Sequence, residues 1–524
     1  MTNLVTNVAE TVAANGDQTA VHYDGEDVSY EELWGRIGMF AAGLQERGFG
    51  EGDRVGVYLP NLPQFVTAFH GTLRAGGVVV PMNPQYKARE IEHLLADSEA
   101  SVVVTLPALV SQVEEVQDDT HVEEIVALGG DPGSSTNYRE FLVEADPDTV
   151  DRADDDVAVQ PYTSGTTGQP KGVELTHDNL ASNASQAADL LPGGVKDDDR
   201  ALGVLPLFHI YGMTVVMNAT LFNGGGFYPL PQWDAQEAIS LVEDQELTIF
   251  HGVPAMYNDV INQPNAEEFD LSSVRLCGVG GSGIPVEVLR KFEELYEPKI
   301  YEGYGLTETS PVTHFNSPNW GRRVGSIGQT LPGIDARVVT ADFDTIDPVP
   351  EGPLDEEEAD LDDVTGELVI SGPNVMKGYH GLPDANADAF TQADGTRWFH
   401  TGDIGYHDED GYFYVVDRKK HMINTAGYNV YPREVEELLF EHEAVADVAV
   451  VGIPDDRRGE TVKAYVVTTP DADVSEDDLK QFVLDNLAEY KHPREVEFVD
   501  ELPRTTTGKV KKFELTEDAK KPTQ

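Results

Sequence analysis

The first 150 residues of the chain alternate between two hydrophobic patterns. Apolar residues recur at helical spacing over residues 30–46 and 64–75, whereas residues 54–59, 77–80 and 101–105 are short valine-rich runs. Short buried strands that alternate with helices are typical of a parallel sheet, because each parallel connection needs a crossover segment. The sequence therefore predicts an α/β fold with parallel-rich sheets for this part of the chain.

The alternation continues beyond residue 150 and changes near the C-terminus. Helices are expected over residues 178–191 and 235–245, strands over residues 200–205 and 247–251, and small antiparallel strands over residues 366–370 and 411–416. Residues 342–363 are acidic and contain three prolines without periodicity, which predicts a surface segment. A compact α+β pattern begins at residue 434, with helices expected over residues 434–440 and 476–488 and strands over residues 446–452, 462–468 and 495–499.

The chain length implies more than one domain. A chain of 524 residues is too long for a single hydrophobic core. We therefore predict an N-terminal α/β domain over residues 1–417 and a small C-terminal α+β domain over residues 418–524.

The charge is strongly negative. The chain has 94 acidic and 36 basic residues, a formal charge of −58 at pH 7. Such a surface repels nucleic acid and anionic membranes, so neither is an expected partner. The acids are interspersed with apolar periodicity rather than gathered in long blocks, which indicates a folded protein with an acidic surface.

This charge predicts a halophilic protein. Self-repulsion strains the compact state in dilute buffer, whereas at molar salt the Debye length shrinks to roughly 3 Å. Circular dichroism and activity are expected to rise together as KCl is added. Full structure and activity in salt-free buffer, with no gain from KCl, would contradict this prediction.

Cysteine content and the N-terminal residues bear on location. The single cysteine, Cys277, excludes an internal disulfide and a multi-cysteine metal site, and its apolar neighbours predict a core position. The start of the chain lacks a basic segment followed by an apolar one, and no run of about 18 apolar residues occurs. The expectation is a cytoplasmic protein without stable membrane insertion.

The densest chemical signal is the stretch Tyr-Thr-Ser-Gly-Thr-Thr-Gly-Gln-Pro-Lys-Gly at residues 162–172. Glycines let backbone N–H groups approach an anion, hydroxyls add donors and Lys171 supplies countercharge, so the stretch is typical of a phosphate-binding loop. It is not the common G-x-x-x-x-G-K-[ST] loop, because Pro170 and Gly172 flank the lysine. A flexible linker is the alternative, but linkers seldom end in Pro-Lys-Gly and then resume apolar periodicity.

A second glycine-rich stretch follows an expected strand. Gly278, Gly280 and Gly283 match G-x-G-x-x-G, and Glu302 lies about twenty residues further on, as in dinucleotide-binding folds. That match is weak, because such a motif belongs in the first βα unit of its domain. A merely structural turn is another interpretation.

Four further stretches carry chemistry. Tyr-Gly-Leu-Thr-Glu at residues 304–308 combines a flat ring with oxygen ligands for a hard cation. Thr-Gly-Asp at residues 401–403 offers a carboxylate that could accept bonds from two ribose hydroxyls, although alone it would indicate a plain turn. Two basic clusters, residues 418–421 and 504–512, stand out in so acidic a chain and suggest anion contacts rather than a merely solvated face.

Together these stretches resemble, in order and spacing, the signatures of the adenylate-forming enzymes, the superfamily of acyl-CoA synthetases, luciferases and peptide-synthetase adenylation domains. The resemblance implies ATP, Mg²⁺ and CoA as cofactors and a carboxylic acid as substrate. It implies a small β-barrel-like part in the N-terminal domain and a mobile C-terminal domain. It also implies roles for individual residues.

The implied phosphate-binding residues are Thr163, Ser164, Gly165, Thr166, Thr167, Gly168 and Lys171. Other nucleotide-binding residues would be Gly281 and Ser282 in an adenine-binding loop, Gly303, Tyr304, Gly305 and Thr307, and Mg²⁺ would be bound by Glu308 with Thr163. The ribose would be held by Asp403 and Arg418, and CoA would meet Gly427 and Tyr428. Lys509 would be the adenylation lysine and Lys420 the hinge between domains, although His421 and Asn424 depart from the pattern of relatives there.

His209 carries the substrate expectation. It lies in the Pro-Leu-Phe-His pattern of acyl-CoA ligases, where it borders the acyl pocket, whereas peptide-synthetase domains tend to carry an aspartate that pairs with the amino acid. The expected substrate is a medium- or long-chain fatty acid. An aryl-CoA ligase, a carrier-protein loading enzyme, an NAD-binding oxidoreductase and a non-catalytic nucleotide-binding regulator remain the alternatives, and homodimer formation stays open.

Overall fold

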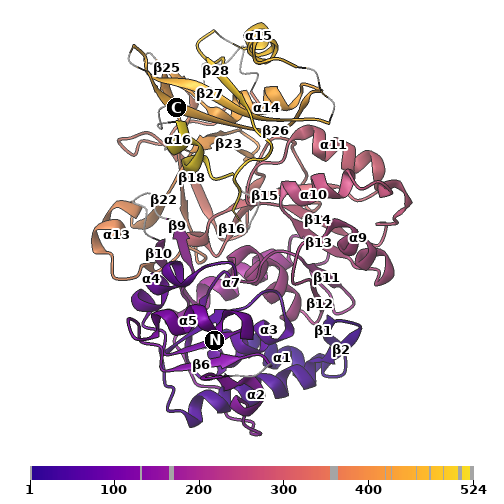
Figure 1. The fold of residues 1–524 in the computed structure, drawn as a ribbon, viewed down its shortest axis with the longest axis vertical. Helices are drawn as coiled ribbons and strands as arrows, with labels where there is room; N and C mark the ends of the chain where they lie inside the picture. Colours follow the sequence, from indigo (N-terminus) through magenta and orange to yellow (C-terminus); the bar gives the residue numbers. More distant parts are fainter. Residues whose placement is uncertain are drawn as a thin grey trace.

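The computed structural model describes residues 3–129, 133–164, 170–354, 364–418, 421–425, 428–455, 457–470, 472, 474–487, 489–505 and 510–519. Figure 1 shows the N-terminal 150 residues at one end and the residues after 430 at the other, with the middle of the chain between them. Within the described ranges, no helix has the length and apolar character needed to cross a bilayer.

Two nine-stranded sheets form the larger part. In each, the central strands pair in parallel, as the β-α alternation predicts. Antiparallel strands lie at both margins of the first sheet and at one margin of the second. The first sheet has the order β17 (Gln329–Thr330), β16 (Val312–Phe315), β15 (Ile300–Gly305), β14 (Leu276–Val279), β13 (Ile249–Gly252), β11 (Arg200–Gly203), β12 (Gly226–Pro229), β1 (Thr19–Tyr23) and β2 (Glu26–Ser29). The second has the order β20 (Gly378–Tyr379), β10 (Pro170–Thr176), β8 (Val157–Val159), β4 (Val78–Pro81), β3 (Arg54–Tyr58), β5 (Val102–Thr105), β6 (Glu124–Ala127) and β7 (Thr136–Asn137), with β9 (Tyr162–Ser164) paired to β10.

Helices connect these strands and cover the sheets. Ser29 begins α2 because its hydroxyl accepts the Glu32 amide while the Glu32 carboxylate accepts the Ser29 amide, both over 3.2 Å. The helices are α1 (Thr6–Asn15), α2 (Tyr30–Glu46), α3 (Pro63–Arg74), α4 (Ala88–Ser98), α5 (Val110–Gln117), α6 (Tyr138–Phe141), α7 (His177–Ala188), α8 (Ala219–Leu221), α9 (Ala235–Asp244), α10 (Pro254–Ile261), α11 (Val286–Leu295) and α13 (Pro383–Ala389). Short 3-10 turns are η1 (Pro107–Leu109), η3 (Ala266–Glu268) and η4 (Thr307–Thr309).

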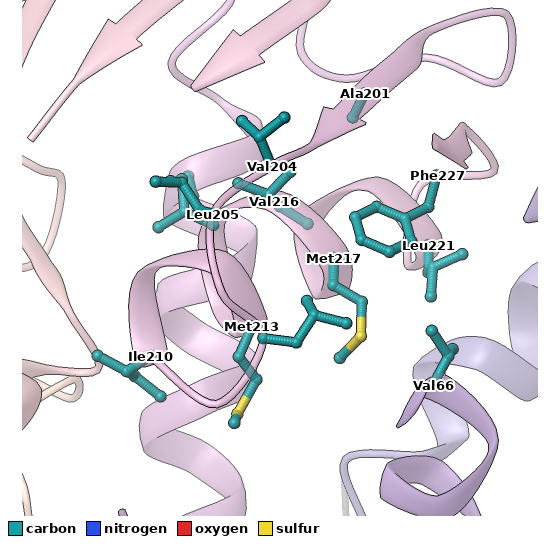
Figure 2. Close-up of a cluster of buried hydrophobic side chains, with 14 of the residues drawn as sticks. Val66, Ala201, Val204, Leu205, Ile210, Met213, Val216, Met217, Leu221 and Phe227 are labelled. Carbon is teal, nitrogen blue, oxygen red and sulfur yellow. The ribbon is translucent and has the colours of Figure 1, made fainter. Parts of the chain in front are cut away.

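One helix has an unusual form. Residues Tyr211–Asn218 make a π-helix, η2, directly after the Pro-Leu-Phe-His stretch. Gly212 permits its close approach to the preceding segment, since a Cβ there would lie 2.6 Å from the carbonyl oxygens of Leu205 and Pro206. Figure 2 shows the hydrophobic cluster around this helix, contributed by Val66, Ala201, Val204, Leu205, Ile210, Met213, Val216, Met217, Leu221 and Phe227.

The small barrel-like part is a five-stranded antiparallel sheet of β18 (Asp335–Val339), β19 (Gly366–Ser371), β22 (Thr396–His407), β21 (Phe390–Ala393) and β23 (Phe413–Arg418). Its longest strand, β22, pairs with β21 at its start and with β23 at its end. The Thr-Gly-Asp stretch is therefore not an isolated turn. It lies inside β22, where Gly402 takes φ +72°.

The C-terminal residues form a separate α+β unit. Its sheet has the order β25 (Tyr428–Val430), β24 (Ile423–Thr425), β27 (Gly459–Thr468) and β26 (Val445–Asp455), with β28 (Glu495–Phe498) paired to β27. The helices are α14 (Pro432–Phe440), α15 (Glu476–Asn486) and α16 (Lys512–Ala519). Two hydrophobic clusters of this unit contain only residues after 420.

Candidate active site

A cavity of about 1200 Å³ gathers most of the described candidate residues. It lies beyond the carboxyl ends of the parallel strands β14 and β15, the usual place for ligands in such sheets. Its walls include Thr163, Lys171, His209, Gly281, Gly303, Tyr304, Gly305, Thr307, Glu308 and Arg418. The sequence predicts functional roles for all ten of these residues.

The phosphate-loop lysine is carried on a hairpin. Strands β9 and β10 pair so that Thr163 lies opposite Lys171 and Ser164 opposite Pro170, which directs the Thr163 and Lys171 side chains to the same face. The His93 ring is hydrogen-bonded to the Pro170 carbonyl over 2.8 Å and fixes the hairpin to α4. Gly165, Thr166, Thr167 and Gly168, which separate the two strands in the sequence, lie outside the described residues.

The Tyr-Gly-Leu-Thr-Glu segment forms a second wall. Gly305 is required by close backbone packing, because a Cβ there would lie 1.9 Å from the Pro311 carbonyl oxygen. The segment then enters the short turn η4, which presents Thr307 and Glu308 to the cavity. The Glu308 carboxylate accepts a hydrogen bond from the Tyr379 hydroxyl over 2.9 Å.

Asp403 lies behind this wall. Strands β22 and β23 place it directly opposite Arg418, whose Nε donates to Asp403 Oδ1 over 2.9 Å. The Tyr304 hydroxyl donates to Asp403 Oδ2 over 2.5 Å. Burial, followed by the Asp403 charge, raises the pKa of Tyr304, so its hydroxyl remains a donor. A carboxylate has about four acceptor positions, so Asp403 retains capacity for further donors.

The G-x-G-x-x-G stretch is explained by packing of this protein's own side chains. A Cβ on Gly278 would lie 2.2 Å from Nδ1 of His251, and one on Gly280 would lie 3.1 Å from the Tyr211 ring. A Cβ on Gly283 would lie 2.2 Å from the Arg433 guanidinium, which reaches over from α14. The pattern thus gives no support to a dinucleotide site. Both Gly281 and Ser282 are exposed, but only Gly281 lines the cavity.

Part of the cavity is apolar. His209 Nδ1 accepts the Tyr211 amide over 3.2 Å, and the Tyr211 hydroxyl is hydrogen-bonded to His251 Nδ1 over 3.1 Å. Burial lowers the pKa of His251 to about 4, so its ring is neutral near pH 7. The apolar lining comes from Leu190, Phe208, Val215, Leu306, Val312 and Phe315.

The C-terminal unit supplies further wall residues of the cavity. Arg504, Thr505, Lys511 and Phe513 line the same cavity. Lys512, from the same basic cluster, instead pairs with Glu436 over 2.7 Å. Lys420, Gly427 and Lys509 lie outside the described residues, and Tyr428 begins strand β25.

Sequence reasoning missed several lining residues. Tyr379 lies on the two-residue strand β20, and Asn83, Gln85, Tyr86 and Glu90 come from the segment after β4. No periodicity or local motif distinguishes these positions, because only the pairing of distant strands brings them to the cavity.

The oxygen donors on these walls fit a magnesium ion that arrives with the nucleotide. In the described part of the chain, no three His, Cys, Asp or Glu side chains form an ion-binding cluster. Glu308 and Thr163 nevertheless supply a carboxylate and a hydroxyl in one cavity. Mg²⁺ bound to substrate phosphates commonly takes one or two protein oxygens and keeps water as its remaining ligands.

The fold and the cavity are those of an adenylate-forming enzyme. The family model described as AMP-binding enzyme matches residues 8–380, and that described as AMP-binding enzyme C-terminal domain matches residues 434–509. The chain therefore belongs to the AMP-binding enzyme family, and it is an AMP-forming acyl-CoA synthetase that uses ATP, Mg²⁺ and CoA.

Relatives match along nearly the whole chain. A long-chain-fatty-acid–CoA ligase of Bacillus subtilis is 37% identical over 98% of this chain and 93% of its own length. A feruloyl-CoA synthase of an Amycolatopsis species is 36% identical, with 95% of each chain covered. The ATP-bound structure of MatB from Rhodopseudomonas palustris is 31% identical and covers 99% of each chain with a TM-score of 0.88. The apo form of the same protein, at 32% identity and equal coverage, has a TM-score of 0.78.

Proposed function

We propose that the protein activates a medium- or long-chain fatty acid with ATP, forming acyl-AMP and pyrophosphate, and then transfers the acyl group to CoA. The observation that carries this proposal is that Lys171, Glu308 and Arg418 share one cavity with a substantial apolar lining. The polar groups suit a nucleotide, and the apolar lining suits the tail of the acid. The fatty-acid ligase from Bacillus subtilis supports the choice of acid.

The first step must bring two anions together. The substrate carboxylate attacks the α-phosphorus of ATP, and pyrophosphate leaves. Charge repulsion is a large part of this barrier, so fixed countercharge and positioning lower it. In this proposal Lys171 and Lys509 supply positive charge, Glu308 and Thr163 hold the Mg²⁺ that accompanies ATP, and Asp403 with Arg418 binds the ribose. The CoA thiol then attacks the acyl carbon and AMP leaves.

Entry of CoA requires the C-terminal unit to move. We place the domain boundary between Asp417 and Arg418 and the hinge near Lys420, with Gly427 and Tyr428 meeting CoA after rotation. The higher TM-score against ATP-bound MatB than against its apo form supports assignment of the present arrangement to the adenylation step.

The single buried cysteine supports a cytoplasmic location. Light scattering in KCl would test for a homodimer.

A panel of acids tests the substrate class. Purified protein in high salt is given ATP, Mg²⁺ and CoA with saturated acids of increasing length, cinnamate-type acids and benzoates, and AMP release is measured. Each methylene buried in the apolar part of the cavity contributes about 0.8 kcal/mol, so kcat/KM is expected to rise about four-fold per methylene until the chain outgrows the cavity.

Aryl acids are the second candidate, because Phe208, Tyr211 and Phe315 line the cavity and the feruloyl-CoA synthase is 36% identical. Preference for an aryl acid without chain-length dependence would replace the fatty-acid proposal. Faster transfer to a phosphopantetheinyl carrier protein than to free CoA would instead identify a loading enzyme.

A further inference from the structure

Strand β20 joins the two parts of the site that handle phosphate and metal in the proposed function. It pairs with β10 two residues beyond Lys171, with Val173 opposite Tyr379 and Glu174 opposite Gly378. The His380 amide donates to the Gly172 carbonyl over 2.8 Å, and the Met376 amide donates to the Glu308 carbonyl over 2.8 Å. One short segment thus fixes the backbones of the lysine strand and the glutamate turn relative to each other.

The backbone of Tyr379 is itself firmly held. Its amide donates to the Asn386 side-chain oxygen over 2.7 Å, and its carbonyl accepts from the Asn386 side-chain nitrogen over 2.9 Å. Gly378 leaves room for this amide, since a Cβ there would lie 2.9 Å from Asn386 Oδ1. The Tyr379 ring therefore projects into the cavity from a fixed base.

Both ends of this side chain meet a functional group. The hydroxyl donates to Glu308 Oε1 over 2.9 Å, and the Lys171 ammonium lies 4.7 Å from the ring centroid, within cation–π range. Burial and the neighbouring Glu308 raise the pKa of Tyr379, so its hydroxyl stays a donor to the carboxylate. Among the described residues, Lys171 and Glu308 contact Tyr379 and do not form a direct ion pair with each other.

We propose that Tyr379 is a positioning residue that keeps Lys171 and Glu308 apart and oriented, so that the lysine remains available to phosphate and the carboxylate to Mg²⁺. A direct pair between the two would neutralise both groups. The ring gives the ammonium another favourable neighbour, and the hydroxyl occupies one carboxylate oxygen and leaves the other free. This inference rests on the roles of Lys171 and Glu308 in the proposed function.

The test measures ATP binding by calorimetry without the acid substrate, once with Mg²⁺ and once with EDTA. Tyr379→Phe keeps the ring but loses the hydroxyl. It is expected to weaken binding of Mg²⁺-ATP about ten-fold, the effect of one hydrogen bond to a charged group, while binding of metal-free ATP is unchanged. Tyr379→Leu also loses the ring beneath Lys171. It is expected to weaken the binding of Mg²⁺-ATP and of metal-free ATP.

Tyr296→Phe is the matched control, because it removes another buried hydroxyl, which donates to the Ala266 carbonyl over 2.8 Å away from the cavity. It is expected to bind ATP as the unaltered protein does. If Tyr379→Phe keeps the normal effect of Mg²⁺, or weakens binding equally with and without Mg²⁺, the inference is wrong. Glu308→Gln separates the two proposals. If Mg²⁺ still strengthens ATP binding by Glu308→Gln as much as by the unaltered protein, the assigned role of Glu308 is wrong. If Glu308→Gln loses this effect of Mg²⁺ and Tyr379→Phe keeps it, only the role of Tyr379 is wrong.

Discussion

Lys509→Ala is expected to lower acyl-adenylate formation by about 10²- to 10³-fold or more, the scale of removing one preorganised transition-state donor. Thioester formation from supplied acyl-adenylate should stay within a few-fold of the unaltered enzyme. The reason is that only in the first half-reaction does an anion attack a charged phosphoryl group, whereas the CoA thiol attacks an uncharged acyl carbon. Arg504, Thr505 and Lys511, on both sides of Lys509 in the sequence, line the cavity from the C-terminal unit.

Lys512→Ala is the control for this experiment. Lys512 belongs to the same basic cluster but pairs with Glu436 over 2.7 Å, so its loss removes an ion pair without removing charge from the cavity lining. Both half-reactions should survive in this variant. Pyrophosphate exchange and the conversion of synthetic acyl-adenylate with CoA measure the two steps separately. Equal loss of both steps in Lys509→Ala would contradict the proposed division of labour.

Asp403→Asn is expected to weaken ATP binding by about 10²-fold, the upper end of the effect of one hydrogen bond to a charged group. Asp403 is 3% exposed and already accepts from Arg418 and Tyr304. The asparagine amide has the same shape but lacks the negative charge opposite Arg418. Its NH₂ group must also face either Arg418 Nε or the Tyr304 hydroxyl, which are both donors. Breaking a buried charge pair also lowers the free energy of unfolding by about 3–5 kcal/mol, a cost that the 40% exposure of Arg418 reduces through solvent screening. Titration calorimetry with ATP gives the affinity directly.

Asp408, the residue directly after β22, is a matched aspartate whose partners, unlike Arg418 and Tyr304, do not line the cavity. Asp408 is also buried, pairs with Arg323 and accepts from the Tyr414 hydroxyl over 2.9 Å. Asp408→Asn should lower the free energy of unfolding to a similar extent as Asp403→Asn but leave ATP affinity unchanged. Indistinguishable ATP affinity in the two variants would remove Asp403 from the nucleotide site.

Local sequence patterns predicted helices and strands well where the buried residues recur with a single helical or strand period. The helix expected over residues 30–46 is α2, and the valine-rich runs of the first 150 residues are β3, β4 and β5 with ends that differ by a residue or so. The capping box at Ser29 explains why α2 begins where the pattern begins. These features depend on neighbours in the chain, which a single sequence displays.

Features set by distant contacts escaped prediction. The Thr-Gly-Asp stretch belongs to a long strand because β21 and β23 both pair with β22. Tyr379 reaches the cavity from an edge strand of only two residues. In the same way, Gly283 fits a dinucleotide pattern by its spacing, but Arg433 from the C-terminal unit occupies the space beside it.

The division of the cavity walls bears on how such enzymes diverge. The apolar part of the cavity is lined by Leu190, Phe208 and Val215. In the charged part, β20 holds Lys171 and Glu308 in place, and the C-terminal unit contributes Arg504. Substitutions among the first group can therefore alter which acid fits without displacing the groups that handle the nucleotide. Relatives at 37% and 36% identity carry names for a long-chain acid and for ferulate, as expected if acid preference evolves independently of the activation chemistry.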